Sequence, residues 1–161
     1  MGDPARFREF AKVIAREFPT RSQRIADVAG GKGMLQAALR CSGYGNIVTF
    51  DKRRHMAKRH RQKFYRYEWF AYNTHRKEFG LVVGMHPDQG TDHAILYAVN
   101  NCVPFAVCPC CIIPSASTLW EPRNSEGWLR HLTALASETH EVTIERMPIN
   151  GKNVVMIGRP K

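Results

Sequence analysis

The residues best suited to chemistry lie between positions 24 and 51, where two apolar runs are each associated with an aspartate. The first run, 24–28, carries Asp27 near its end and leads into Ala29-Gly30-Gly31-Lys32-Gly33; the second run, 46–50, leads directly to Asp51. Glycines let the backbone approach a ligand without a Cβ in the way. A carboxylate after the second strand can accept both hydroxyl hydrogens of a ribose. This spacing predicts a nucleotide-like cofactor over the carboxyl ends of two neighbouring strands.

The elements that must position these residues follow from hydrophobic periodicity. A helix over 33–40 separates the two strands, 24–28 and 46–50. An amphipathic helix precedes them, with Asp3 as its N-cap and Pro4 at its first position, and it ends before Pro19. The first strand, the glycine-rich turn and the second strand therefore form one β-α-β unit.

The later chain repeats this alternation. Strands are predicted over 79–85 and 103–107, a helix that Thr91 or Asp92 can cap lies between them, and another helix runs from about 125 to 139. Strands over 141–147 and 153–157 are joined by Asn150-Gly151, a strong hairpin signal. The order predicts one α/β domain over 1–161. Its sheet has about seven mostly parallel strands and a C-terminal antiparallel hairpin, with helices on both faces.

Charge is the most pronounced feature of the composition. Lys and Arg number 24 against 14 Asp and Glu, which gives a net charge of +10 and favours a polyanionic partner. From Lys52 to Arg66 the chain has no acid, and aromatic residues follow at once. This run predicts RNA contact; the alternative is a solvated helix followed by core aromatics. The candidate nucleic-acid-binding residues are Arg53, Arg54, Lys58, Arg59, Arg61 and Lys63.

The rest of the composition bears on the cellular location and on the redox state of the cysteines. No stretch of about 18 apolar residues suggests a membrane span, and the N-terminus lacks the apolar core of a signal peptide. The five cysteines, three of them within 108–111, do not resemble a secreted disulfide framework. We therefore expect reduced thiols, a cytoplasmic or nuclear location and no membrane association.

The pattern of an acid followed by glycines at alternating positions resembles motif I of the class I S-adenosylmethionine (SAM)-dependent methyltransferases. Asp27, Gly31 and Gly33 match, and Ala29 replaces the first glycine. The closing hairpin and Asp51 also fit that superfamily, whose fold is Rossmann-like. The resemblance implies SAM as cofactor, with the motif at the methionine end, Asp51 on the ribose and the region of Glu68 near the adenine. The implied cofactor-binding residues are Asp27, Ala29, Gly30, Gly31, Gly33, Asp51, Lys52, Glu68, Trp69, Gly84 and Met85.

A narrower resemblance covers the segment from His86 to Cys111. His86, Thr91-Asp92 and Pro109-Cys110-Cys111 match a branch of the superfamily that includes tRNA ribose methyltransferases and poorly characterised methyltransferase-like proteins. The branch implies an RNA substrate, tRNA or rRNA. A separate partner protein could supply substrate recognition.

His86, Asp88 and Asp92 are the catalytic candidates, because the loop after the strand over 79–85 lies beside the cofactor in such sheets. Structural alternatives are that Asp92 caps its helix and that His86 makes a structural hydrogen bond. Zinc on Cys108, Cys110 and Cys111 with His86 or His93 is disfavoured by the spacing, so no metal is expected and a packed thiol cluster is preferred. Cys110 as a nucleophile is a further alternative.

Two other functions are compatible with the residues. One is a small-molecule methyltransferase, which predicts negligible RNA affinity. The other is a non-catalytic nucleic-acid-binding protein on the same scaffold, which predicts no SAM binding.

Overall fold

The computed structural model describes residues 3–53, 64–115 and 124–161. Within these ranges the helices are α1 (Arg6–Glu17), α2 (Met34–Cys41), α3 (Thr91–Asn101) and α4 (Ser125–Ala136), with a short 3-10 helix, η3 (Asp88–Gly90). The strands are β1 (Ile25–Val28), β2 (Ile47–Phe50), β3 (Tyr65–Arg66), β4 (Leu81–Met85), β5 (Phe105–Cys108), β6 (His140–Arg146) and β7 (Val154–Pro160). No described helix is long and apolar enough to cross a membrane.

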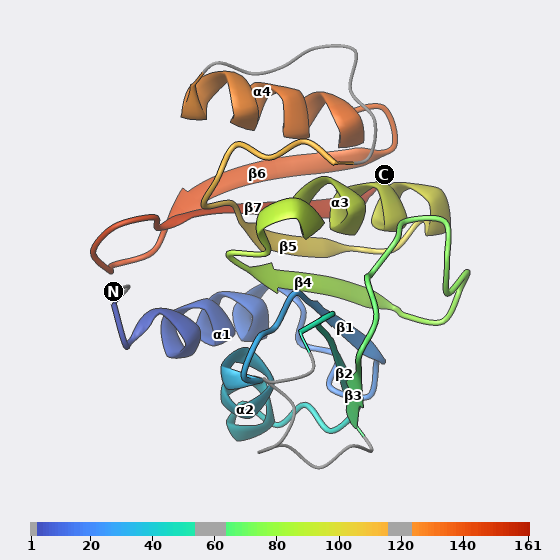
Figure 1. Ribbon diagram of the computed structural model, residues 1–161, viewed down its shortest axis with the longest axis vertical. Helices are drawn as coiled ribbons and strands as arrows, with labels where there is room; N and C mark the ends of the chain where they lie inside the picture. Colours follow the sequence, from blue (N-terminus) through green and yellow to red (C-terminus); the bar gives the residue numbers. More distant parts are fainter. Residues whose placement is uncertain (1–2, 54–63, 116–123) are drawn as a thin grey trace.

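The strands form one seven-stranded sheet in the order β3-β2-β1-β4-β5-β7-β6 (Figure 1). Strands β1 to β5 are parallel, and β7 runs antiparallel to both β5 and β6. The predicted fold class is confirmed: a mostly parallel sheet closed by an antiparallel hairpin. The order reverses at β1 and β4, which is where ligands bind in open α/β sheets.

Side chains alternate between the two faces of the sheet, and each face has its own core. Ile25, Ile47 and Leu81 pack with α1 and α2 on one face. Ala26 and Val82 pack with α3 and α4 on the other. Near-continuous apolar strands are expected when helices cover both sides of a parallel sheet. This three-layer packing fixes the strand ends that carry the candidate site.

Two local predictions differ from the structure. Helix α1 begins at Arg6, not at Pro4, because the Asp3 side chain accepts the N–H of Ala5 at 2.8 Å and forms a turn before the helix. The β6–β7 connection is one residue longer at each end than the predicted strand bounds of 147 and 153 implied, because β6 ends at Arg146 and β7 begins at Val154. The Asn153 amide donates to carbonyls within it and pairing resumes only at Val154.

Candidate functional site

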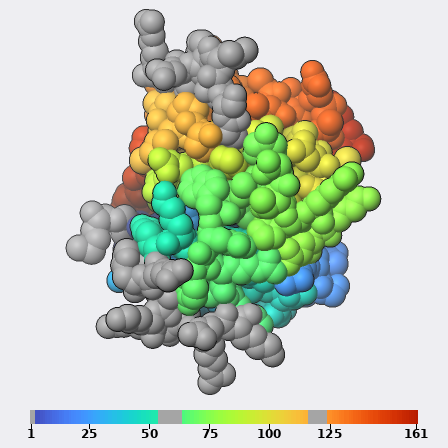
Figure 2. Space-filling model, turned by 45° about the vertical axis from the view of Figure 1, so that its right-hand side comes forward, coloured from blue at the N-terminus to red at the C-terminus, as the bar shows by residue number. Residues whose placement is uncertain are grey.

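The loops that follow the parallel strands gather on one side of the molecule. In Figure 2 the cyan chain around residues 51–53 meets the green segment after Phe64. The yellow-green loop after β4 and the orange loop after β5 lie beside them. Two cavities border these loops, and a third lies between the loop after β5, helix α4 and the β6–β7 connection. We name them the Asp51 cavity, the Asp27 cavity and the Trp128 cavity, after one lining residue of each.

The turn after β1 is built in the left-handed region of backbone space. Ala29, Gly31 and Gly33 have φ of 53°, 54° and 73°. Glycine adopts such values freely, whereas alanine there is strained. A Cβ at Gly30 would lie 2.3 Å from Oδ2 of Asp27, so this position has no room for a side chain. The turn therefore brings bare backbone against the ends of β1 and β2.

Asp27 is fully buried beneath this turn. The Thr49 hydroxyl donates to its Oδ2 at 2.9 Å, as the register Asp27↔Thr49 requires. Its other oxygen, Oδ1, has no hydrogen-bond partner among the described residues. Burial raises the pKa of Asp27 to about 7, with the Thr49 hydrogen bond acting in the opposite direction. A buried carboxylate oxygen without a partner suits a cationic or hydrogen-bonding ligand group.

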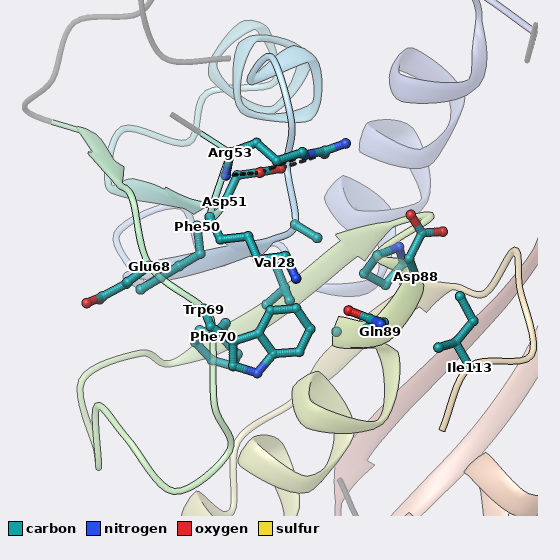
Figure 3. Close-up of a pocket in the computed structure, with 14 residues that line it drawn as sticks. Val28, Phe50, Asp51, Arg53, Glu68, Trp69, Phe70, Asp88, Gln89 and Ile113 are labelled. Atoms are coloured by element: carbon teal, nitrogen blue, oxygen red, sulfur yellow. Dashed lines mark hydrogen bonds and ion pairs between the residues drawn. The ribbon is translucent and has the colours of Figure 1, made fainter. Parts of the chain in front are cut away.

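Asp51 directly follows β2 and is 4% exposed. The Gly31 N–H donates to Oδ2 at 2.9 Å, so the glycine turn and the second acid are in contact. Arg53 donates through Nε to Oδ1 at 2.9 Å and through Nη2 to Oδ2 at 2.7 Å (Figure 3). Burial alone would raise the pKa of Asp51, but the hydrogen bonds from Arg53 and Gly31 outweigh it and hold the pKa below its usual value. Asp51 is therefore ionised at neutral pH.

The Asp51 cavity has a volume of about 220 Å³. Figure 3 places Asp51 and Arg53 on one side of it, Trp69 near the middle, and Asp88 with Ile113 on the opposite side. It is lined by Val28, Ala29, Phe50, Asp51, Lys52, Arg53, Glu68, Trp69, Phe70, Pro87, Asp88, Gln89, Gly90 and Ile113.

Three predicted cofactor residues, Lys52, Glu68 and Trp69, form one wall of the Asp51 cavity. The Lys52 ammonium lies 5.1 Å from the Trp69 ring centroid, a cation–π distance. A carboxylate oxygen of Glu68 lies 3.0 Å from Nε2 of His75. Trp69 thus offers an aromatic surface, and Glu68 a carboxylate, on the side of the cavity away from Asp88.

The Asp27 cavity, of about 350 Å³, lies on the other side of the glycine turn. Predicted residues Met85 and His86 line it, together with Arg53, which borders both this and the Asp51 cavity. Gly84 lies in β4, where a Cβ would come within 3.0 Å of the Pro87 ring, and it borders none of the three cavities. The full lining is Arg6, Phe7, Asp27, Ala29, Gly30, Gly31, Lys32, Met34, Leu35, Arg53, Met85 and His86.

The loop after β4 holds two catalytic candidates in left-handed backbone, with φ of 55° at His86 and 49° at Asp88. Non-glycine residues in this region are uncommon, and such strain clusters at functional sites. Nε2 of His86 lies 2.9 Å from the Lys152 carbonyl, which can only accept, so Nε2 carries the hydrogen and Nδ1 has a free lone pair. Burial lowers the pKa of His86, so the ring is neutral at pH 7.

Asp92, the third candidate, is fully buried at the start of α3. Its carboxylate accepts the Ser115 N–H at 2.7 Å, the Ser115 hydroxyl at 2.9 Å and the His93 N–H at 2.9 Å. The Ser115 hydroxyl oxygen also lies within hydrogen-bond distance of the Gln89 carbonyl, so its one hydrogen is shared between the two acceptors. Asp92 therefore ties the loop after β5 to the loop after β4.

Some lining residues were not anticipated from the sequence. Arg6 and Phe7 reach the Asp27 cavity from α1, and Ile113 reaches the Asp51 cavity from the loop after β5. Arg53 pairs with Asp51, and its place two positions after that acid is the sequence signal for the pairing. The charge pattern instead predicts nucleic-acid contact for Arg53. Of that predicted set, Arg54, Lys58, Arg59, Arg61 and Lys63 lie outside the described residues.

Comparison with known proteins shows which solved structures share this fold. No family model matches the chain, and no curated protein matches it. Among solved structures, the glycopeptide N-methyltransferase MtfA, complexed with S-adenosylhomocysteine (SAH), superposes with a TM-score of 0.65 at 9% identity; the match covers 100% of this chain and 92% of MtfA. A SAM-dependent methyltransferase from Aquifex aeolicus gives 0.59 at 11% identity, covering 98% and 93%. The fibrillarin/Nop5p complex gives 0.63 at 8% identity, covering 96% and 83%.

These similarities define the class of fold. The chain has the class I SAM-dependent methyltransferase fold, with the sheet order, the closing hairpin and helices on both faces of the sheet.

Proposed function

We propose that the protein is a SAM-dependent methyltransferase. The observation that carries the proposal is the pair Asp27 and Asp51, which lie near the ends of two adjacent parallel strands of this fold, with the turn between them held to Asp51 by the Gly31 N–H. Both carboxylates border cavities, and one buried oxygen of Asp27 has no partner among the described residues. These features fit a ligand with a ribose at one end and an amino acid at the other.

The residues of the two cavities match the parts of SAM. Asp51 would hold the ribose hydroxyls, and the Trp69 wall would face the adenine. Asp27 would meet the methionine ammonium group from below the glycine turn. When bound, SAM supplies a methyl group on a sulfonium, and the protein positions the acceptor and handles one proton.

His86 is the candidate for proton handling, because its ring lines the Asp27 cavity and is neutral at pH 7. The Lys152 carbonyl holds Nε2–H, which leaves Nδ1 able to take a proton from an acceptor. Asp88 borders the Asp51 cavity on the side facing Asp51 and is the second candidate for orienting the acceptor. Asp92 holds the loop after β5 against the start of α3, so its proposed role is to position the loops that carry the other candidates.

We propose RNA as the substrate class, tRNA or rRNA. The net charge of +10 and the run of Lys and Arg after Asp51 support this, since phosphate contacts dominate nucleic-acid affinity. Because this run follows the ribose-binding acid directly, it would bring a phosphate backbone close to the cofactor. A protein partner could add recognition; the fibrillarin neighbour was itself crystallised as a complex with Nop5p.

A direct test incubates the protein with total RNA and SAM carrying an isotope-labelled methyl group, followed by mass spectrometry of the nucleosides. A labelled methyl nucleoside is the expected result. Labelled product only among small molecules would favour the small-molecule alternative. No labelled product, together with no SAM binding, would favour the non-catalytic alternative and contradict the enzyme proposal.

RNA contact is tested separately by charge reversal. Arg59→Glu combined with Arg61→Glu should weaken RNA binding and lower its salt dependence, while SAH binding stays unchanged. The matched control, Arg76→Glu with Arg130→Glu, makes the same charge change at exposed positions elsewhere. Equal losses in both variants would show that only net charge matters and would contradict a specific RNA-binding segment.

A further inference from the structure

Three metal-ligating side chains meet where the loops after β4 and β5 come together. The Cys110 thiol donates to Oδ1 of Asp88 at 2.8 Å, and its sulfur lies 3.5 Å from the sulfur of Cys111. One ligand atom from each of the three residues lies within 4.8 Å of the others. Two loops thus place two sulfurs and a carboxylate around one point.

This cluster differs from the cysteine-histidine sets that the sequence suggested. Cys108 is buried in β5, where its thiol faces the Lys152 carbonyl, so it stays apart from the cluster. His86 is engaged by the same carbonyl, and Nδ1 of His93 accepts the Tyr72 N–H. The cysteine-histidine set, whose spacing disfavours zinc, does not include Asp88, which comes from a different loop.

We propose that Asp88, Cys110 and Cys111 form a zinc site. In a tetrahedral zinc centre with Zn–S bonds of about 2.3 Å, two sulfurs lie about 3.8 Å apart. The observed separation of 3.5 Å is close to that value. Zinc binds both thiolates and carboxylates. Magnesium and calcium bind oxygen ligands, so the two thiolates favour zinc over either of them.

A divalent cation at the cluster would displace the thiol protons and release them on binding. The cluster is partly accessible, since Asp88 and Cys111 are exposed and Cys110 is half-buried, so a metal has an entry path.

The framework around the cluster is already ordered. The register pairs Met85 with Cys108, so the loops after β4 and β5 start at the same level of the sheet. Asp92 and Ser115 then join these loops by hydrogen bonds. The two loops that carry the ligands are therefore held together before a metal binds, which favours binding.

The site lies between two cavities, because Asp88 lines the Asp51 cavity and Cys110 lines the Trp128 cavity. Zinc with three protein ligands keeps a fourth position for water or a substrate atom. If the methyltransferase proposal holds, that position would receive an acceptor atom entering from the Trp128 cavity. The metal-binding proposal itself stands without SAM and is measured in its absence.

The test titrates the reduced, metal-stripped full chain with Co²⁺ and follows the thiolate-to-cobalt charge-transfer band; Zn²⁺ affinity is then measured by competition with a metallochromic indicator. We expect one equivalent to bind with a thiolate band. Cys110→Ser and Cys111→Ser should each weaken Zn²⁺ binding by more than the roughly 10- to 100-fold that follows loss of an outer-shell partner. Asp88→Asn should also weaken it.

The matched control is Cys41→Ser, which removes an exposed thiol at the end of α2 and should leave Zn²⁺ affinity unchanged. Circular dichroism checks that each variant is folded. The proposal is overturned if the wild type shows no thiolate band under reducing conditions. It is also overturned if folded Cys110→Ser and Cys111→Ser bind Zn²⁺ as tightly as the control. SAH titration of the same zinc-free samples reports on the cofactor independently.

Discussion

Replacing Asp51 with asparagine tests the proposed ribose contact with little change in shape. The Asp51 carboxylate accepts hydrogen bonds from Gly31 and Arg53 and is almost fully buried. An asparagine can still accept the Gly31 N–H, but it presents one donor where the carboxylate presented a second acceptor. The turn should therefore survive while the ribose contact is lost.

The magnitude follows from the two hydrogen bonds that the ribose hydroxyls would make. A hydrogen bond to a charged group is worth about 1.5–3 kcal/mol, against about 0.5–1.5 kcal/mol for a neutral pair. Losing the charge at both contacts should cost about 2–3 kcal/mol, which corresponds to roughly 30- to 150-fold weaker SAH binding. Arg53 is a competitor for the same oxygens in the free protein, which places the expected value toward the lower end.

Isothermal titration with SAH measures this difference directly. Glu141→Gln, which makes the same change at an exposed position on β6, serves as the control and should bind like the wild type. Thermal unfolding checks that Asp51→Asn remains folded. Binding within about threefold of the wild type, in a folded variant, would refute the assignment of Asp51 to the ribose.

Four further predictions concern neighbouring residues. Because burial raises the pKa of Asp27 to about 7 from a usual 3.8, the folded state retains a proton that the unfolded chain releases. The free energy of unfolding should therefore fall as pH rises from about 4 to 7, and Asp27→Asn should flatten that fall in urea titrations; an unchanged profile would contradict the assignment. Ala29→Gly should raise the free energy of unfolding by about 0.5–1 kcal/mol, since it relieves left-handed strain; a loss of stability would argue against that conformation. Arg53→Ala should tighten SAH binding by about three- to tenfold while lowering the melting temperature, because it frees Asp51; weaker binding would mean that the guanidinium contacts the cofactor. Asp92→Ala should lower the free energy of unfolding by about 2–4 kcal/mol through loss of the loop-joining hydrogen bonds; lost turnover at unchanged stability would instead support a direct catalytic role.

Much of the fold could be predicted because each signal was local. Apolar runs of strand length, the glycines after Asp27 and the hairpin turn residues act within a few positions of one another. The mostly parallel pairing then follows from the connection rules for β-α-β units, whereas the order of the strands in the sheet comes from the structure. Asp27 and Asp51 lie near neighbouring strand ends for the same reason. The hydrogen bond from the Gly31 N–H to Asp51 shows that the glycine turn contacts the second acid.

Other features depend on side chains from distant segments and could not be read in advance. The meeting of Asp88 with Cys110 requires both the β4–β5 register and the hydrogen bonds of Asp92 that join the loops. The start of α1 shifted because Asp3 bonded within its own turn. The Arg53 guanidinium could pair with Asp51 or contact a nucleic-acid phosphate. Its position in the sequence does not decide between these two roles, and the structure shows the pairing with Asp51.

The central claim is that Asp27, the glycine turn and Asp51 bind SAM. Isothermal titration of the wild-type chain with SAM and with SAH at neutral pH tests it most directly. We expect saturable binding at one site per chain for both molecules. No heat of binding at millimolar concentrations of either would contradict the claim.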